Sequence, residues 1–159
     1  MFSKEAKDIF GDRILSIDID SLVVGNIDDV VSYTDSAFKA IHGTCSPYNG
    51  SLWSLATGEL SYVWDEFNQN SIAEVIKNTR RSNGKPFYGS DQAWMSYKIK
   101  DAPTWSHKDG IYQFHSGRSW KQLPDNMRIM FAAGGIKFWD NAMQKLYPNL
   151  FDLYKEASS

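Results

Sequence analysis

Two aspartates one residue apart, Asp18 and Asp20, interrupt the apolar run ILSIDIDSLVVGN at residues 14–26. Alternate residues of a strand point to the same side, so an extended chain would project both carboxylates together, with Ile17 and Ile19 on the other side. Adjacent carboxylates repel, and a divalent cation that prefers oxygen ligands, Mg²⁺ or Mn²⁺, relieves that repulsion. The alternative interpretation is a solvated strand end, or pairing with Arg13 or a lysine, and the pair alone does not separate the two.

The elements that would position these residues follow from hydrophobic spacing and turn residues. Apolar residues at helical spacing before Gly11 predict a helix, after which a buried strand runs over 13–19. Ser90 or Asp91 is expected to cap a helix that buries Trp94 and Met95. The alternation of helices and strands indicates an α/β architecture. The other expected elements are a helical turn in GNIDDVVSY, strands over 37–42, 48–57, 111–115 and 127–133, two helical pieces within 60–80 and a last helix from Asp140 with a kink at Pro148.

Composition and charge narrow the class of protein. The chain has 159 residues, 42% of them hydrophobic, which predicts one globular domain over residues 1–159. A net charge of −2 argues against nucleic-acid binding by a basic surface. Cys45 stands alone, and no apolar run approaches the roughly 18 residues of a membrane span. The expected location is cytoplasmic, because the first residues, MFSKEAKDIFGDR, lack a signal core.

Four sequence blocks occur in an order that resembles a known family. They are LSIDIDSLVVGNIDDV, YNGSLWSLATGELSYVWDEF, GSDQAWMSYKI and GGIKFWD, and they extend over roughly residues 8 to 140. In this order they resemble the signature blocks of nucleotide-sugar glycosyltransferases of the A-type, Rossmann-like fold, nearest to family 8 and its bacterial and phage relatives. The resemblance implies an α/β nucleotide-diphospho-sugar transferase fold.

The resemblance also implies a role for each matching residue. Asp18 and Asp20 match the family's Asp-x-Asp, which binds Mn²⁺ or Mg²⁺ against the donor diphosphate. Asp91 and Gln92 match its catalytic Asp-Gln pair, whose aspartate contacts donor-sugar hydroxyls near the reacting carbon. The remaining donor and sugar contacts implied are Asn49, Gly50, Ser51, Gly134, Lys137 and Trp139, with Lys137 reaching the diphosphate. From the residues alone, Asn49-Gly50 is as typical of a hairpin or strand-entry turn as of a sugar contact. Asp91 alone is also typical of a helix cap.

The last block departs from the family pattern at the metal site. The family has a histidine ligand where this chain has Ala133, and a proline where it has Phe138. A methyl group cannot bind a metal, so Asp18 and Asp20 would need water and the diphosphate as further ligands, which Mg²⁺ accepts. His115 is a candidate replacement ligand, although a lone histidine beside apolar residues is more often structural.

A second departure concerns length. Enzymes of this kind carry a base- and ribose-binding segment before the Asp-x-Asp strand, and here Met1 precedes Asp18 by 17 residues. The sequence therefore predicts a fold truncated at its N-terminus, with a hydrophobic sheet edge that would pair with a second copy or a complementing N-terminal chain.

Two functions are compatible with these residues. The first is a metal-dependent glycosyltransferase, or its catalytic portion, acting on a nucleotide diphosphate-sugar and an acceptor hydroxyl. The second is a degenerate or partner-dependent relative that binds a sugar or another chain. Among the aromatic residues, Trp53, Trp64 and Trp94 are expected in the core, and Trp105, Trp120 and Trp139 in a pocket.

Overall fold

The computed structural model describes residues 1–43, 46–78, 90–114, 122–132 and 137–157 of the chain. The chain divides into two compact units, which are described one at a time. Unit 1 comprises Met1–Ser16 and Ser32–Trp105, and unit 2 comprises Ile17–Val31 and Ser106–Ser159. The expectation of one domain over residues 1–159 stays a prediction.

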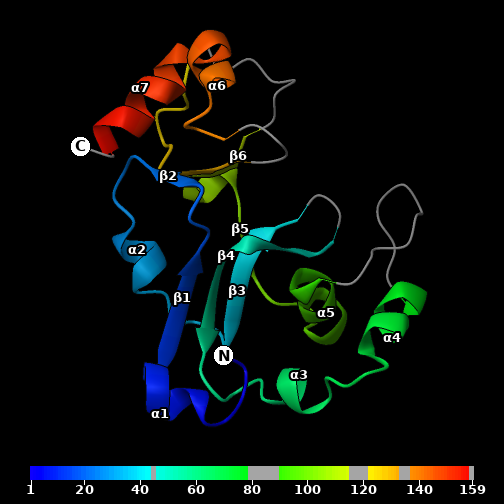
Figure 1. The fold of residues 1–159 in the computed structure, drawn as a ribbon. Coiled ribbons are helices and arrows are strands. Elements are labelled where there is room, and N and C mark those ends of the chain that lie inside the picture. Colours follow the sequence, from blue (N-terminus) through cyan, green and yellow to red (C-terminus); the bar gives the residue numbers. More distant parts are fainter. Residues whose placement is uncertain (44–45, 79–89, 115–121, 133–136, 158–159) are drawn as a thin grey trace. The chain divides into compact units, whose positions relative to one another are not determined.

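Unit 1 is a four-stranded sheet with helices packed against it (Figure 1). The strand order is β1-β4-β3-β5, so β1 and β5 are the two edge strands of this sheet. Strand β3 runs antiparallel to β4 and parallel to β5. The elements are α1 (Ala6–Phe10), β1 (Arg13–Ile17), β3 (Phe38–His42), β4 (Tyr48–Ala56), α3 (Tyr62–Asp65), α4 (Ser71–Asn78), α5 (Asp91–Lys98) and β5 (Thr104–Trp105).

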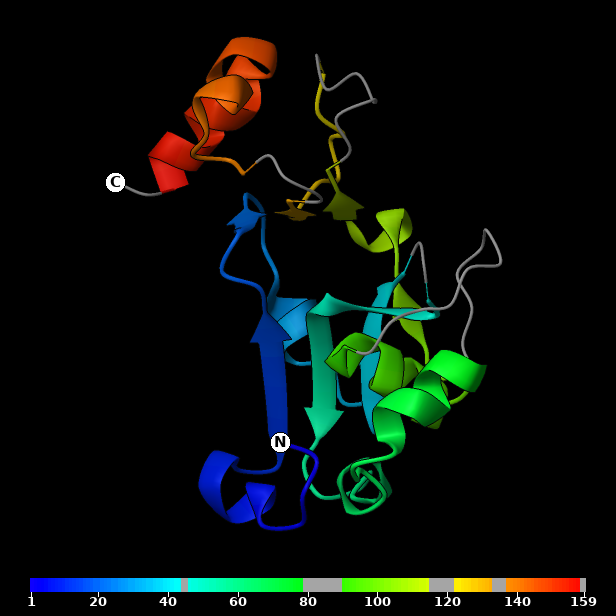
Figure 2. The same cartoon turned by 45° about the vertical axis from the view of Figure 1, so that its right-hand side comes forward.

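The core of unit 1 lies between this sheet and helix α5. Figure 1 and Figure 2 both show α5 beside β3 and β4, and its buried residues Trp94 and Met95 pack on Phe38 and Trp53 of those strands. The indole Nε1 of Trp94 donates a hydrogen bond of 2.7 Å to the carbonyl of Val63. This bond satisfies the one polar atom of a ring that is otherwise buried for its apolar area.

Unit 2 contains a three-stranded sheet covered by the C-terminal helices. In the order β2-β7-β6, β2 pairs antiparallel with β7 and β6 pairs parallel with β7. Its core contains Leu22, Phe114, Met130, Phe138 and Leu150, which are all 1% exposed or less apart from Leu22 at 2%. The elements are β2 (Ser21–Val23), α2 (Asp28–Val31), the 3-10 helix η1 (His107–Asp109), β6 (Ile111–Gln113), β7 (Ile129–Phe131), α6 (Asn141–Leu146) and α7 (Pro148–Ala157).

The mixed α/β class predicted from the sequence is confirmed, as are most of its expected elements. Two differences follow from local chemistry. The last helix is two helices rather than one kinked helix, because Pro148 lies at the first position of α7, where a missing N–H costs no hydrogen bond. The short strands β2 and β5 were not anticipated, since three- and two-residue strands carry no periodicity of their own. Within the described residues, no helix has the length and apolar character needed to cross a membrane.

Candidate functional site

The aspartate pair of unit 2 lies in a turn that follows β1. The strand ends at Ile17, two residues earlier than the sequence predicted, and Asp20 lies within the turn. Ser21 closes this turn, because both its N–H (3.2 Å) and its hydroxyl (2.6 Å) donate to the carbonyl of Asp18. Ile19 is therefore 99% exposed, and the expectation that it faces away on an extended strand is wrong. Serine hydroxyls commonly close such turns, so Ser21 was the signal available in the sequence.

Lys137 is the partner of one of the two aspartates. Its ammonium forms an ion pair with Oδ2 of Asp20, whose side chain is 16% exposed, while Asp18 is exposed. The backbone N–H of Lys137 donates to Oδ2 of Asp140, the residue that precedes α6, at 2.6 Å. The start of α6 thus fixes Lys137 beside Asp20. The pairing of an aspartate with a lysine, which was the alternative to a metal, is present for Asp20.

The residues around Asp18 and Asp20 offer a small set of ligands for a cation. Among the described residues, no group of three or more His, Cys, Asp or Glu side chains converges to hold a metal ion. Two carboxylates still fit a hard cation such as Mg²⁺, which keeps several waters and is often held by one or two carboxylates together with substrate phosphates. Such an ion would displace Lys137 from Oδ2 of Asp20 or use the other oxygen.

Of the other residues expected near the metal and the diphosphate, the structure describes Trp139. The ring of Trp139 is 47% exposed and lies 6.2 Å from the ring of Tyr154 in a tilted arrangement. Three further positions lie outside the described residues: the expected donor or sugar contact Gly134, the departure at Ala133 and the candidate ligand His115.

The expected sugar contacts of unit 1 lie together at the N-terminus of α5. The amide N–H of Gly50 donates to Oε1 of Gln92 at 3.2 Å, and Nε2 of Gln92 donates to the hydroxyl of Ser46 at 2.9 Å. Oδ1 of Asn49 accepts a hydrogen bond of 2.8 Å from the N–H of Ser51. The structure therefore brings the Asn-Gly-Ser segment and the Asp-Gln pair into direct contact, although they are about 40 residues apart in sequence.

An irregularity in the β3–β4 ladder produces this contact. Ala40 pairs with Trp53, whereas the next residue, Ile41, pairs with Asn49, so residues 50–52 of β4 have no partner on β3. Such bulges bend a strand and redirect its side chains. Asn49-Gly50 accordingly lies inside β4 and does not form the hairpin turn or strand entry that the dipeptide alone allows.

Asp91 is the first residue of α5 and has one carboxylate oxygen without a partner among the described residues. Ser90 is the N-cap, as predicted, because its hydroxyl accepts a hydrogen bond from the N–H of Ala93. Asp91 is thus not the capping residue, and its Oδ1 accepts from the N–H of Gln92 at 2.8 Å. The other carboxylate oxygen of Asp91 is therefore available to a ligand at the N-terminus of α5.

The tryptophans divide between core and pocket differently from the prediction. Trp53 and Trp94 are buried as expected, at 4% and 6% exposure. Trp64 is 60% exposed because it lies on the short helix α3, and its expected burial is wrong. Trp105, on the edge strand β5, is 3% exposed and packs edge-on against the ring of Tyr33, and its expected place in a pocket is wrong as well. Trp120 lies outside the described residues.

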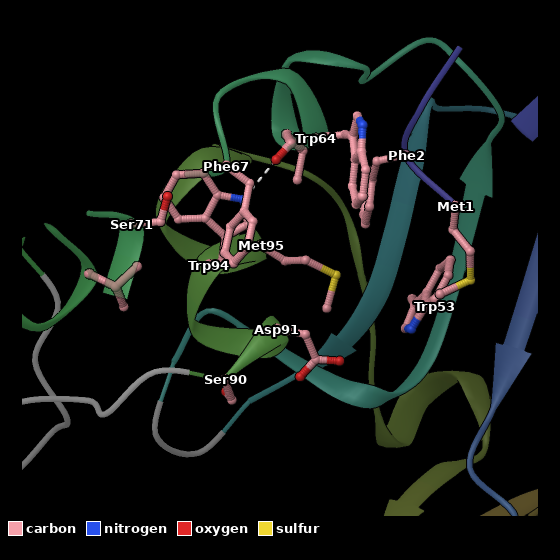
Figure 3. A pocket seen from close by; sticks show the side chains of 12 residues that line it. Met1, Phe2, Trp53, Trp64, Phe67, Ser71, Ser90, Asp91, Trp94 and Met95 are labelled. Atoms are coloured by element: carbon pink, nitrogen blue, oxygen red, sulfur yellow. Dashed lines mark hydrogen bonds between the residues drawn. The ribbon is translucent and has the colours of Figure 1, made fainter. Parts of the chain in front are cut away.

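A pocket of about 430 Å³ lies next to Asp91 within unit 1 and was not predicted from the sequence (Figure 3). Four separate segments contribute to its wall, so no local pattern reports it. Its residues are apolar or aromatic apart from Ser71, Ser90 and Asp91. Figure 3 shows Asp91 and Met95 extending from α5 into the same space. Its apolar lining includes Phe2, Trp53, Trp64, Phe67 and Met95.

Comparisons with known proteins place the fold. No protein-family model matches the chain, and no curated protein matches it. Among solved structures, galactosyltransferase LgtC in complex with donor and acceptor sugar analogs matches with a TM-score of 0.57 and 11% identity. Two crystal structures of the glycosyltransferase GlyE from Streptococcus pneumoniae TIGR4, one of them the apo form, match with TM-scores of 0.56 and identities of 13% and 16%.

These matches cover nearly all of this chain but only part of the matched proteins. They cover 91% of this chain and 61% of LgtC, and 96% and 92% of this chain against 44% and 42% of the two GlyE chains. The fold is therefore that of A-type glycosyltransferases, as the sequence blocks predicted, and the chain spans less than two thirds of the enzymes it matches. A likeness of fold at this identity does not by itself establish an activity.

Proposed function

We propose that the chain is a metal-dependent glycosyltransferase, or the catalytic portion of one, that transfers a sugar from a nucleotide diphosphate-sugar to an acceptor hydroxyl. The observation that carries the proposal is the hydrogen bond from Gly50 to Gln92, the neighbour of Asp91, in a chain with the fold of A-type glycosyltransferases. A carboxylate, a carboxamide and a strand amide provide the donors and acceptors that sugar hydroxyls require.

In this proposal the residues of unit 1 bind the donor sugar. The free oxygen of Asp91 accepts a hydrogen bond from a sugar hydroxyl, and Gln92 is held for the same task by its bonds to Gly50 and Ser46. In the reaction the oxygen of the acceptor hydroxyl bonds to the anomeric carbon and gives up its proton to the leaving diphosphate, while the bond from that carbon to the diphosphate oxygen breaks. The diphosphate leaves with the bonding electron pair, so negative charge grows on it.

In this proposal the residues of unit 2 stabilise the negative charge that grows on the diphosphate. Lys137 would exchange its ion pair with Asp20 for a contact with the diphosphate, and Asp18 and Asp20 would hold Mn²⁺ or Mg²⁺. A divalent cation bound there supplies Lewis-acid stabilisation of the leaving diphosphate. The fit rests on the oxygen ligands of the two aspartates and on the cationic side chain beside them.

The ion pair between Lys137 and Asp20 also favours a second function. An aspartate already neutralised by a lysine needs no cation, which is the arrangement expected of a relative that binds a sugar or another chain without transferring it. Metal-dependent binding of a nucleotide distinguishes the two functions, because only the enzyme requires it.

The test is a thermal denaturation series with Mn²⁺ and a panel of nucleotide diphosphate-sugars. A ligand at about 100 times its Kd stabilises the folded chain by about 2.7 kcal/mol, which raises the melting temperature by several degrees. We expect a rise that needs both Mn²⁺ and one donor and that disappears in Asp18→Asn and Asp20→Asn. Asp125→Asn, an exposed aspartate of the same unit, is the matched control and should keep the rise. A folded chain that no donor stabilises would refute the transferase proposal in favour of the second function.

A further inference from the structure

The pocket beside Asp91 is large enough for a small molecule but offers it almost no hydrogen bonds. Its volume of about 430 Å³ lies within the range of roughly 300–1,000 Å³ typical of ligand sites. The hydroxyl oxygen of Ser71 accepts a hydrogen bond from the N–H of Asn68 at 2.7 Å. The hydroxyl oxygen of Ser90 accepts one from the N–H of Ala93 at 3.2 Å. Among the side-chain oxygens of the wall, the second oxygen of Asp91 is the one that has no hydrogen-bond partner in the described residues.

The remaining wall is aromatic or aliphatic and comes from separate segments. The rings of Phe2 and Trp53 stack at 6.1 Å, and the ring of Phe67 meets Trp94 edge-on at 5.5 Å. The indole N–H of Trp94 is already bonded to Val63. A free sugar in this space would bury several hydroxyls without partners, which is costly for each of them.

From this distribution of groups we infer that the pocket binds the apolar portion, alkyl or aryl, of a ligand whose single hydrogen-bond donor reaches Asp91. The role of this ligand rests on the proposed function: in a glycosyltransferase, the ligand is the acceptor. Its hydroxyl head shares the free carboxylate oxygen of Asp91 with the donor-sugar hydroxyl, because one carboxylate oxygen can accept two hydrogen bonds. Its apolar aglycone lies against Phe2, Trp64, Phe67 and Met95. The acceptor is then a hydroxyl compound with a hydrophobic group and not a free sugar.

Calorimetric titration with a matched series of probes tests the inference without metal or nucleotide. Octyl glucoside, below its critical micelle concentration, has both the apolar chain and a hydroxyl head, whereas methyl glucoside has only the head. We expect octyl glucoside to bind at least about tenfold more tightly, because burial of the chain provides most of the free energy. Octyl sulfate has the same chain with an anionic head and should bind more weakly than octyl glucoside, because Asp91 repels it. The inference would be overturned if octyl glucoside and methyl glucoside bound with equal affinity, or if octyl glucoside and octyl sulfate did.

A pair of phenylalanines supplies the matched variants. Phe67 and Phe10 are similarly exposed, at 52% and 54%, but only Phe67 lines the pocket. Phe67→Ala should weaken octyl glucoside binding about five- to tenfold, while Phe10→Ala should leave it within about twofold. Trp64→Ala, also on the wall and 60% exposed, is a second variant whose truncation spares the core. If Phe67→Ala and Trp64→Ala both fold and bind octyl glucoside as the wild type does, the pocket is not the binding site.

The outcomes of this experiment distinguish a failure of the pocket inference from a failure of the proposed function. Loss of probe binding with intact Mn²⁺-dependent donor stabilisation would reject the apolar acceptor and leave the transferase proposal standing. Probe binding that depends on Phe67, in a chain that no donor stabilises, would keep the pocket and reject its role as an acceptor site.

Discussion

Replacing Lys137 by methionine should change metal binding and nucleotide binding in opposite directions. The ammonium of Lys137 pairs with Oδ2 of Asp20, so a cation that uses this oxygen must first displace it. Methionine keeps much of the length of the side chain and removes the charge. Mn²⁺ should therefore bind Lys137→Met more tightly than the wild type, while a nucleoside diphosphate, which loses a cationic contact, should bind less tightly.

The size of the change follows from the exposure of the pair. The side chains of Lys137 and Asp20 are 34% and 16% exposed, so water screens their attraction in part. A pair of this kind is expected to contribute about 1 kcal/mol. Removing that competition corresponds to an increase in Mn²⁺ affinity of about fivefold.

Titration followed by the electron paramagnetic resonance signal of free Mn²⁺ measures this affinity directly. The control is Lys7→Met, which removes the same charge from an exposed pair with Asp12 at 3.0 Å in unit 1. It should leave Mn²⁺ binding unchanged. Equal or weaker Mn²⁺ binding by Lys137→Met would refute the reasoning, since it would mean that the ion does not use Asp20. Unchanged nucleoside diphosphate binding would refute the role of Lys137 at the diphosphate.

Two further predictions concern unit 2, and urea denaturation measures both. Gly110→Ala should lower the free energy of unfolding by more than about 2 kcal/mol, because φ is +75° and a Cβ would lie 2.3 Å from the carbonyl oxygen of Asn126. The control is Gly58→Ala, which should cost only about 1 kcal/mol, because φ is similar at +80° but the nearest neighbour of the added Cβ is 3.6 Å away. Equal losses of stability in the two variants would refute the steric argument. The hydrogen bond from Arg128 holds the pKa of Asp29 below its ordinary value, so this carboxylate stabilises the fold at neutral pH and that contribution is lost as the pH falls below about 4. Asp29→Asn should therefore be less stable than the wild type by up to about 1 kcal/mol at pH 7, and this difference should shrink as the pH falls below about 4; a difference of the same size at every pH would contradict this account.

Local patterns in the sequence predicted the elements that depend on neighbouring residues. Ser90 was expected as a cap of α5 and is its N-cap, because capping involves residues three positions apart. Strand β4 and the break between α3 and α4 likewise follow from turn residues and periodicity. The order of the four sequence blocks predicted the A-type fold, which the solved structures confirm. The end of β1 was misplaced because the hydroxyl of Ser21 closes a turn where apolar alternation continues.

The sequence by itself determined which polar groups are available for chemistry: two aspartates one residue apart in an apolar run, an Asp-Gln pair at the start of a helix, and a lysine before the last helices. Only the tertiary structure decided their partners. Lys137 pairs with Asp20, which is 117 positions away in the sequence, and Gly50 bonds to Gln92 at the irregularity of the β3–β4 ladder. Trp64, expected to be buried, is exposed, and Trp105, expected in a pocket, is buried. Periodicity reports which face of an element is apolar, but the identity of the facing element depends on packing between distant segments, which no local pattern records.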